Sequence, residues 1–419
     1  MDTITVKLPC GHSEVSVQIP TSNLLGIYHP RDSGLGGDEI SVVQHALAHP
    51  INSPRLRELA QKGQRVAIIT SDRTRPCPSQ KLLPLILEEL AIAGISEEDI
   101  IIVMALGLHR SMSDPEIKTA VGEDICRRIR VINHDPNHTV GIGLTSAGTP
   151  IEIFRPVVNA DLRICLGNLE LHYFAGFSGG AKAVLPGCAS ETTIRANHAR
   201  MVEPDATTGR LKGNPVRDDM EEGVGLLGVD FILNVLVNHQ HQIIKAVAGD
   251  VIAAHRQGCR FVAQRCMVSI PQAADIALVS AGGYPKDVNL YQAQKALDNA
   301  TNAVREGGII VMVVECCEGY GNQTFESWMR GLCSPDDILA RIQDDFVIGG
   351  HKAAAFARVL KRAEIYLVSN LQANAVQSCG MEPFQNVVDA VETALDVIGP
   401  AARVAVFPQG GSVLPFVDG

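Results

Sequence analysis

The sequence predicts an α/β protein of two domains, each a largely parallel sheet flanked by helices. Three observations favour this class. The chain has 419 residues, and at about 150 residues per domain this length suits two or three domains. Short β-branched apolar runs alternate with helix-like segments. The 38 glycines exceed the usual share, as expected of a fold with many tight strand-to-helix turns.

The first part of the chain repeats one unit of strand, polar loop and helix. The strands are expected at residues 65–70, 100–106 and 161–166. The helices that follow them are expected at 79–93, from Ser113 onwards, and at 191–200. Ser113-Asp114-Pro115-Glu116 is a good helix start, because a serine cap precedes a proline and an acidic first turn.

The same unit continues after residue 268, where a fresh series begins. Its strands are expected at 275–280, 309–314 and 365–369, with a helix at 289–304. We therefore expect an N-terminal domain over 1–268 and a C-terminal domain over 269–400, with a tail of about 401–419 that returns to the first domain.

Charge and cysteine usage limit the classes of partner and the compartment. The 36 basic and 46 acidic residues give a net charge of −10, which offers no general attraction to nucleic acid or anionic membranes. The start of the chain lacks a signal-peptide pattern, and the apolar runs fall short of the ~18 residues that span a bilayer. The eleven cysteines include no C-x-x-C pair, as is usual for reduced thiols. We expect a cytoplasmic protein.

Polar clusters follow the expected strands. They are Asp72 with Arg75, His109 with Arg110, the Gly-rich stretch 167–187, and residues 284–295. In open parallel sheets, ligands bind beyond the carboxyl ends of the strands. We therefore expect these clusters to face one crevice, with the active site in the cleft between the two domains.

The Gly-rich stretch is typical of phosphate recognition, yet it matches no common nucleotide motif. Aligned with a P-loop from Gly176, the stretch has Ala181 where the motif requires its second glycine. It has Ala183 where the motif requires the Ser or Thr that binds magnesium. A surface loop is the simpler interpretation, but the stretch is rich in Leu, Val, Phe and Tyr. If Lys182 is buried, its amine must be paired or neutral, and a neutral amine is a nucleophile.

His109, His172 and His198 lie in or beside these loops. Imidazole is both a metal ligand and a natural base near neutral pH, although a single histidine is more often structural. Arg75 could hold a carboxylate, with Asp72 steadying it, or form an ordinary surface ion pair. Gln292 and Lys295 share one helix face, which is either functional or solvated.

Taken together, the motifs resemble those of the lactate racemase family, whose enzymes depend on a nickel-pincer nucleotide. The resemblance covers essentially the whole chain. The motifs are Ser-Asp-x-Thr-Arg-Pro (71–76), Gly-x-His-Arg (107–110), Glu-x-His-Tyr-Phe-Ala-Gly-Phe-Ser-Gly-Gly-Ala-Lys (170–182), Leu-Pro-Gly (185–187), Asn-His (197–198), Gly-Gly-Tyr-Pro-Lys-Asp (282–287) and Gln-x-x-Lys (292–295).

The resemblance implies a cofactor site in the N-terminal domain. The cofactor is a pyridinium mononucleotide whose two sulfur-bearing substituents grip nickel. Lys182 would be its covalent anchor, through a thioamide, and His198 the remaining nickel ligand. The residues implied near the nucleotide phosphate are Gly176, Ser178, Gly179 and Gly180.

The resemblance also implies the reaction: a racemase or epimerase that inverts C2 of a lactate-type 2-hydroxy acid. Proton-coupled hydride transfer to the cofactor would pass through a 2-keto acid. His109 and His172 would be the acid/base residues. The residues implied to hold the substrate carboxylate are Arg75, Gln292 and Lys295, with Asp72 in support and Tyr291 close by, the C-terminal domain contributing its share.

Alternatives remain open at this point. The same chemistry suits malate, a longer or aromatic 2-hydroxy acid, or C2 epimerisation of an aldonic acid such as gluconate. A nucleotide-binding protein without turnover would need Lys182 and His198 but not the other two histidines. A zinc hydrolase would need a third ligand and a base, for which Glu170 is the nearby candidate. The expected partners are cofactor maturation enzymes and a small-molecule substrate.

Overall fold

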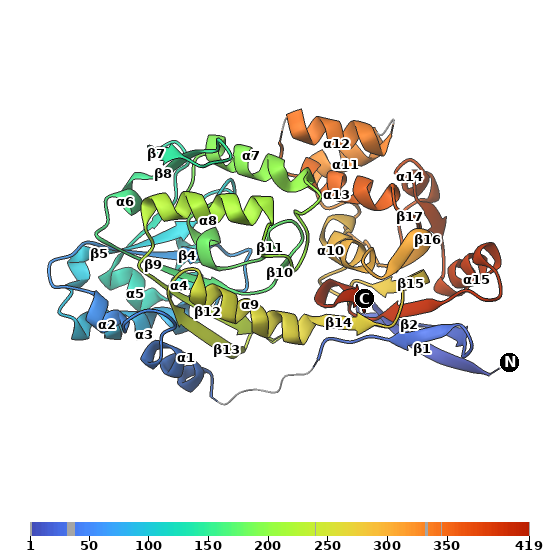
Figure 1. Ribbon diagram of the computed structural model, residues 1–419, viewed down its shortest axis with the longest axis horizontal. Coiled ribbons are helices and arrows are strands. Elements are labelled where there is room, and N and C mark those ends of the chain that lie inside the picture. The colour runs from blue at the N-terminus through green and yellow to red at the C-terminus, as the bar shows by residue number, and fades with distance from the viewer. Residues whose placement is uncertain (1, 32–37, 239, 332–333, 345, 419) are drawn as a thin grey trace. The chain divides into compact units, whose positions relative to one another are not determined.

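Figure 1 shows the computed structural model, which describes residues 2–31, 38–238, 240–331, 334–344 and 346–418. The chain divides into two compact units. We call Asp32–Gln264 the middle unit, and Met1–Arg31 together with Arg265–Gly419 the terminal unit. Each is built on a six-stranded, largely parallel sheet with helices, so the predicted fold class is confirmed.

The division differs from the expected domains at both ends of the chain. The boundary falls at Gln264, but the first 31 residues and the tail both belong to the terminal unit. The reason is strand pairing. In the tail, β19 (Val404–Phe407) inserts between β15 (Ala274–Ser280) and β3 (Leu24–Ile27), so that both chain ends complete one sheet. The tail therefore does not return to the unit that contains Lys182.

The middle unit's sheet has the strand order β13-β12-β9-β4-β5-β6, and only β13 runs antiparallel to its neighbour. Its strands are β4 (Val66–Ser71), β5 (Ile100–Ala105), β6 (Arg130–Asn133), β9 (Leu162–Asn168), β12 (Phe231–Val237) and β13 (Ile243–Gly249). Two small hairpins accompany it, β7 (Thr139–Leu144) with β8 (Pro150–Phe154) and β10 (Leu171–His172) with β11 (Gly176–Phe177).

Helices cover both faces of this sheet (Figure 1). Apolar side chains of α1, α3, α4 and α5 build the core on one face, while α7 and α8 lie on the other. The helices are α1 (Glu39–Ala48), α2 (Leu56–Leu59), α3 (Ser79–Ile92), α4 (Asp114–Val121), α5 (Glu123–Arg128), α6 (Arg155–Val158), α7 (Glu191–Ala199), α8 (Pro215–Leu227) and α9 (Ala253–Cys266), with short 3-10 turns η1 (Glu97–Asp99), η2 (Gly180–Ala183) and η3 (Arg200–Val202).

The terminal unit's sheet has the order β18-β17-β16-β15-β19-β3, with all pairs parallel. Its further strands are β16 (Val304–Val313), β17 (Ala363–Val368) and β18 (Glu382–Phe384). Outside this sheet, β1 (Thr3–Cys10) pairs with β2 (Ser13–Pro20), and β14 (Met267–Ile270) with β20 (Leu414–Val417). Its helices are α10 (Leu290–Ala300), α11 (Gln323–Arg330), α12 (Pro335–Asp344), α13 (Gly350–Leu360), α14 (Ala373–Gln377) and α15 (Val387–Ile398), with η4 (Gly410–Ser412).

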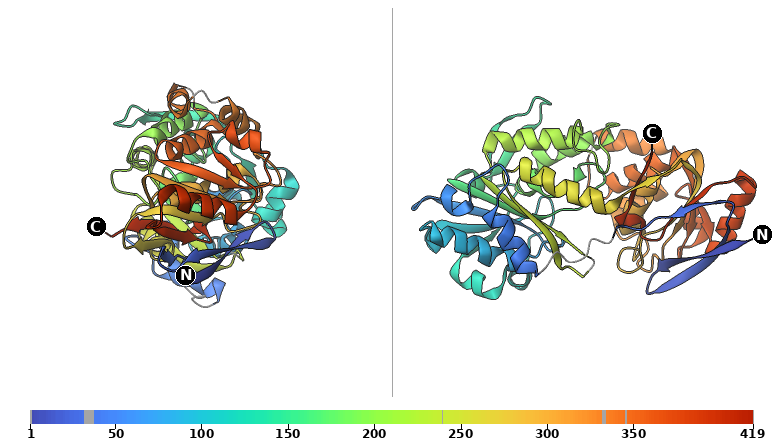
Figure 2. Two further views of the ribbon diagram at one scale, coloured as in Figure 1. Left: turned by 90° about the vertical axis from the view of Figure 1, so that its right-hand side faces the viewer. Right: turned by 60° about the horizontal axis from the view of Figure 1, so that its bottom comes forward.

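The β1–β2 hairpin and α15 cover one face of this second sheet (Figure 2). Alternate residues of the hairpin, Val6, Leu8, Val17 and Ile19, are buried with apolar residues of α15 and of the central strands. This is the period-2 burial expected of a hairpin with one solvated face.

The predicted elements agree with the observed ones to within a few residues. The largest differences meet at one place: the strand expected at 309–314 already begins at Val304, so the helix expected at 289–304 ends at Ala300. Among the described residues, none of the helices is both long and apolar enough to cross a membrane.

Candidate active site

Three neighbouring strands of the middle unit end beside the predicted site residues. β9, β4 and β5 are adjacent in the sheet, and the loops after them carry Lys182, Asp72 and His109 respectively. The grouping of these clusters at one sheet edge is therefore observed within this unit.

Asp72 and His109 form a tight pair. The Nδ1 atom of His109 lies 2.5 Å from Oδ2 of the buried Asp72, whose other oxygen accepts hydrogen bonds from the Thr74 amide and hydroxyl at 2.9 and 2.6 Å. Burial alone would raise the pKa of Asp72, but the hydrogen bonds from His109 and Thr74 outweigh it and lower that pKa. Asp72 thus stays charged and keeps the His109 proton on Nδ1, leaving Nε2 as the basic nitrogen.

Asp72 does not steady Arg75 in the expected way. The carboxylate turns toward His109 and Thr74, and the link to Arg75 is a backbone one, from the Arg75 amide to the Asp72 carbonyl at 3.2 Å. The reason is local: Oδ1 accepts from Thr74 in an Asx turn and Oδ2 contacts His109, so both carboxylate oxygens of Asp72 are engaged. Arg75 is exposed.

Glu116 joins the loops that follow β4 and β5. Its carboxylate pairs with Arg73 at 3.1 Å and with Arg110 at 2.6 Å, and the pair with Arg110 is the main cause that lowers the pKa of Glu116 to about 2. The Arg110 of the predicted motif is therefore used to hold the loop.

The Gly-rich stretch folds around one aromatic ring. Residues 171–177 form the β10–β11 hairpin, and Phe174 at its tip is buried. The Phe174 ring meets the His172 ring at 4.6 Å and the His198 ring at 5.0 Å, both edge-on, and Lys182 Nζ lies 5.6 Å from its centre. Phe174 thus brings the predicted anchor, one acid/base residue and the predicted nickel ligand to one place.

Arg217 of α8 binds the backbone carbonyls of this stretch. Its fully buried guanidinium donates hydrogen bonds to the carbonyls of Ala175 at 3.2 Å, Gly179 at 3.4 Å, and Phe177. Five donors in a rigid plane suit a loop that offers several carbonyls at once. The loop is consequently a fixed part of the core.

The environment of Lys182 favours its neutral form. Burial, followed by the positive charges of Arg217 and Arg75, holds the pKa of Lys182 well below its ordinary value, against the opposing charge of Glu170. A lysine with a lowered pKa is a nucleophile near neutral pH, as a covalent anchor requires.

The two remaining histidines differ in their Nδ1 contacts. His172 Nδ1 accepts a hydrogen bond from the Ala175 amide at 3.3 Å, so the neutral ring carries its proton on Nε2. His198, near the end of α7, has Nδ1 3.0 Å from Oδ1 of Asn197 and is largely buried. In their neutral forms, His172 therefore carries its proton on Nε2 and His109 carries its proton on Nδ1.

The residues implied at a phosphate take part in the loop's own hydrogen bonds. The Ser178 hydroxyl donates to the Asn168 carbonyl at 2.8 Å and accepts from the Glu170 amide at 2.9 Å. The Gly180 amide donates to Asn234 at 2.7 Å. Gly176 has φ +74°, and a Cβ there would lie 2.0 Å from the Arg210 carbonyl, so only glycine fits. A phosphate role for Gly176, Ser178, Gly179 and Gly180 stays a prediction.

The terminal unit places Tyr291, Gln292 and Lys295 in the first turns of α10. Asn289 caps this helix by accepting from the Gln292 amide at 2.9 Å, and Lys352 Nζ lies 5.4 Å from the Tyr291 ring centre. Gln292 is exposed. That these residues meet the histidines of the middle unit stays a prediction.

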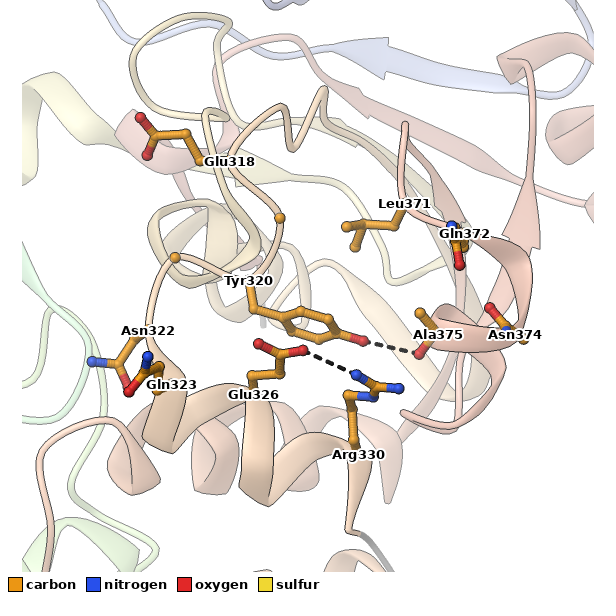
Figure 3. A pocket seen from close by; sticks show the side chains of 12 residues that line it. Glu318, Tyr320, Asn322, Gln323, Glu326, Arg330, Leu371, Gln372, Asn374 and Ala375 are labelled. Atoms are coloured by element: carbon orange, nitrogen blue, oxygen red, sulfur yellow. Dashed lines mark hydrogen bonds and ion pairs between the residues drawn. The ribbon is translucent and has the colours of Figure 1, made fainter.

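A pocket of about 510 Å³ in the terminal unit is lined by the loop after β16, by α11, and by the loop after β17 with the start of α14 (Figure 3). The loop after β16 forms one wall and packs on α10, whose Leu290 amide donates to the Gly319 carbonyl at 3.0 Å. The Glu326–Arg330 pair and Tyr320, whose hydroxyl donates to the Ala375 carbonyl at 3.0 Å, line it.

Sequence reasoning assigned no role to Phe174, Arg217 or Asp219, the last a partner of Asn197. A buried arginine or aspartate on a helix has the same local pattern as an exposed one, so only Phe174, inside the recognised stretch, had a signal in the sequence. Within the described residues, no three His, Cys, Asp or Glu side chains are grouped to hold a metal ion, and the zinc-hydrolase alternative depends on such a group.

Two family models match the chain. The lactate racemase N-terminal domain matches residues 10–209, and the lactate racemase C-terminal domain matches residues 270–415.

Two curated proteins are similar over nearly their whole length. A lactate racemase of Thermoanaerobacterium thermosaccharolyticum is 34% identical over 421 residues, covering 98% of each chain. A lactate racemase of Lactiplantibacillus plantarum is 34% identical over 434 residues, covering 98% of this chain and 99% of the other. The solved apoprotein structure from the first organism superposes with a TM-score of 0.90 at 33% identity, covering 98% of this chain and 100% of the other.

Proposed function

Because the chain belongs to the lactate racemase family of isomerases, we propose that it inverts C2 of lactate, or of a related 2-hydroxy acid, with a nickel-pincer nucleotide as cofactor. The family prediction made from the motifs is confirmed. The observation that carries the proposal is the convergence of Lys182, His172 and His198 on the Phe174 ring.

The side chains present fit such a cofactor. Lys182 offers an amine whose pKa is lowered, as attachment to an activated carboxyl group requires. His198 offers one imidazole, and the absence of a three-ligand group among the described residues suits a metal whose other ligands come from an organic group. When bound, the nucleotide supplies a carbon that accepts a hydride from C2 and returns it.

His109 and His172 are arranged to move the hydroxyl proton in opposite directions. Asp72 keeps the His109 proton on Nδ1, so Nε2 can accept the substrate's hydroxyl proton and Asp72 stabilises the resulting imidazolium. His172 can donate a proton to the forming hydroxyl from its protonated, imidazolium form, and this returns it to the neutral ring whose Nδ1 accepts from the Ala175 amide. Conversion of the opposite enantiomer exchanges the two roles, through a 2-keto acid in both directions.

Arg75 is the proposed carboxylate ligand of the middle unit. It is exposed, and its charge is felt at Lys182, where it lowers the pKa. A guanidinium binds a carboxylate through two parallel hydrogen bonds and so fixes the substrate's orientation. We propose that Gln292 and Lys295, with Tyr291, complete this contact, and that Asp72 acts through His109.

The test is an assay of racemisation by the protein after it has been produced together with cofactor maturation enzymes. We propose that these enzymes are its partners in the cytoplasm. We expect a mass adduct, bound nickel, and conversion of D- or L-lactate to a mixture on chiral chromatography. Lys182→Ala should lose the adduct, while the exposed control Lys245→Ala keeps it. An adduct that persists in Lys182→Ala contradicts the anchor, and a loaded chain without turnover on any substrate favours a nucleotide-binding protein.

The identity of the 2-hydroxy acid is decided by a substrate panel. Malate, 2-hydroxy-4-methylpentanoate, phenyllactate and gluconate differ in the group beyond C2, whereas the proposed contacts to the carboxylate and hydroxyl are common to all. Faster inversion of one of these than of lactate would assign the chain to that substrate within the same chemistry.

A further inference from the structure

Asp219 lies at the centre of a buried hydrogen-bond network one residue removed from His198. Its carboxylate accepts from Thr145 Oγ1 at 2.5 Å, Thr149 Oγ1 at 2.9 Å and Asn197 Nδ2 at 2.7 Å, and its side chain is almost fully buried. Three donors satisfy a carboxylate that would otherwise be costly to bury.

This network fixes the orientation of the Asn197 amide. Its Nδ2 donates both to Asp219 and to the Val216 carbonyl at 3.1 Å, two groups that can only accept. Oδ1 must therefore face the His198 ring, whose Nδ1 lies 3.0 Å away. An amide oxygen accepts and does not donate, so the Nδ1 atom of His198 carries the proton and Nε2 holds the lone pair.

We infer that Asp219 and Asn197 are positioning residues that hold His198 in the Nδ1–H tautomer, with Nε2 as its ligating atom. The inference rests on the proposed function only in giving His198 a metal to bind. Partners of this kind fix the ring and tautomer of metal-binding histidines, and their loss lowers metal affinity by about 10- to 100-fold.

The decisive variant is Asp219→Leu, which changes no direct partner of His198. Without the carboxylate, nothing prevents the Asn197 amide from turning its Nδ2 toward Nδ1 of His198, and we expect the Nε2–H tautomer to increase severalfold. Asp219→Asn should keep the wild-type tautomer, because its amide oxygen can still accept from Asn197.

Thr149→Val is the matched control. It removes one buried hydrogen bond to the same carboxylate but leaves the chain of contacts from Asp219 through Asn197 to His198 in place. If the tautomer responded only to damage in this part of the core, Thr149→Val would move it as well.

The measurement is ¹⁵N NMR of the histidine-labelled, cofactor-free chain at a pH where the ring is neutral, with His198 assigned from a His198→Gln variant. Asn197→Ala provides a second test should Asp219→Leu not fold, and it too should raise the Nε2–H tautomer. A wild-type tautomer in Asn197→Ala, or a shift of equal size in Thr149→Val, overturns the inference. Racemisation is not involved, so failure of the proposed function shows separately as a loaded chain without turnover.

Discussion

At the carboxyl edge of the middle unit's sheet, the chemically important side chains are enclosed by partners. Asp72 holds His109, Arg217 holds the stretch that carries Lys182, and Asn197 contacts His198. The terminal unit has a sheet of the same size, and beside it α10 buries its apolar face but presents Gln292 exposed in its first turn.

The difference suggests a division of labour. A reactive group needs a defined protonation state, which requires burial and close partners, and both are found around Lys182 and Asp72. A residue that only recognises a carboxylate needs access and a donor, which Gln292 has. Variants of these enclosed residues should therefore alter chemistry or folding, and variants of the exposed Gln292 on α10 should alter substrate affinity.

The largest effect is expected from the histidine pair. His109→Ala and His172→Ala should each lower the rate of racemisation by about 10²- to 10⁴-fold, because each removes one of the two proposed proton-transferring groups. Nickel content and the mass adduct should not change. The exposed His138→Ala is the control. Normal turnover in either active-site variant would contradict the two-base assignment and remove the contrast between the units.

Loss of Arg217 should come next, as a change in stability. Arg217→Ala leaves three buried carbonyls without their donor, so we expect the free energy of unfolding to fall by about 3 kcal/mol. Chemical denaturation measures it. Arg210, in an exposed pair with Asp205 at 2.6 Å, is the control, with an expected change within about 1 kcal/mol. Equal effects would mean that the hydrogen bonds from Arg217 do not stabilise the Gly-rich stretch.

Acid stability allows a comparison of the units on equal terms, because each buries a carboxylate between two arginines. Burial would raise the pKa of Asp275 and of Glu89, but Arg403 with Arg305, and Arg57 with Arg55, lower both pKa values. A carboxylate whose pKa is lowered by folding stabilises the protein fully above its unfolded-state pKa of about 4. This contribution to stability is lost as the pH falls from there through the folded-state pKa.

Asp275→Asn and Glu89→Gln should each lower stability at pH 7 by about 2 kcal/mol and flatten its decline toward pH 3. Denaturant unfolding at a series of pH values measures both quantities. A variant that keeps the full acid dependence of the wild type would show that the substituted carboxylate does not contribute to it.

The smallest effect is expected on α10. Gln292→Ala should raise KM about 10-fold, or about 1.4 kcal/mol, with kcat little changed, since it removes a contact proposed for both ground and transition states. The exposed Glu306→Ala serves as the control. A fall in kcat without a change in KM would place Gln292 with the chemical groups.

Much of the fold was predictable from the sequence, because each buried parallel strand is a β-branched run ended by a turn. The predicted strand at 100–106 corresponds to β5, for example, and the serine cap at 113 opens α4. The placement of β3 and β19 in one sheet was not predictable, since strands almost 400 residues apart have no local signal for pairing.

The candidate site divides in the same way. Its residue types and their positions at strand ends are visible in the sequence, which is why Asp72, His109 and Lys182 could be grouped. Which groups touch is a tertiary property. Asp72 lies near Arg75 in the chain, yet its carboxylate contacts His109, 37 positions away. The contacts of Arg217 and Asp219 likewise arise only when α8 packs against the sheet.

One helix, α8, carries both Arg217 and Asp219. Side chains two positions apart on a helix point about 200° from each other. Arg217 on one side of α8 therefore contacts the Gly-rich stretch, and Asp219 on the other side contacts Asn197. The spacing between the two is consequently set by a single rigid rod. A displacement of α8 would move both attachment points together. A substitution on the outward side of α8 would therefore disturb the surroundings of Lys182 and His198 without replacing any residue that contacts them.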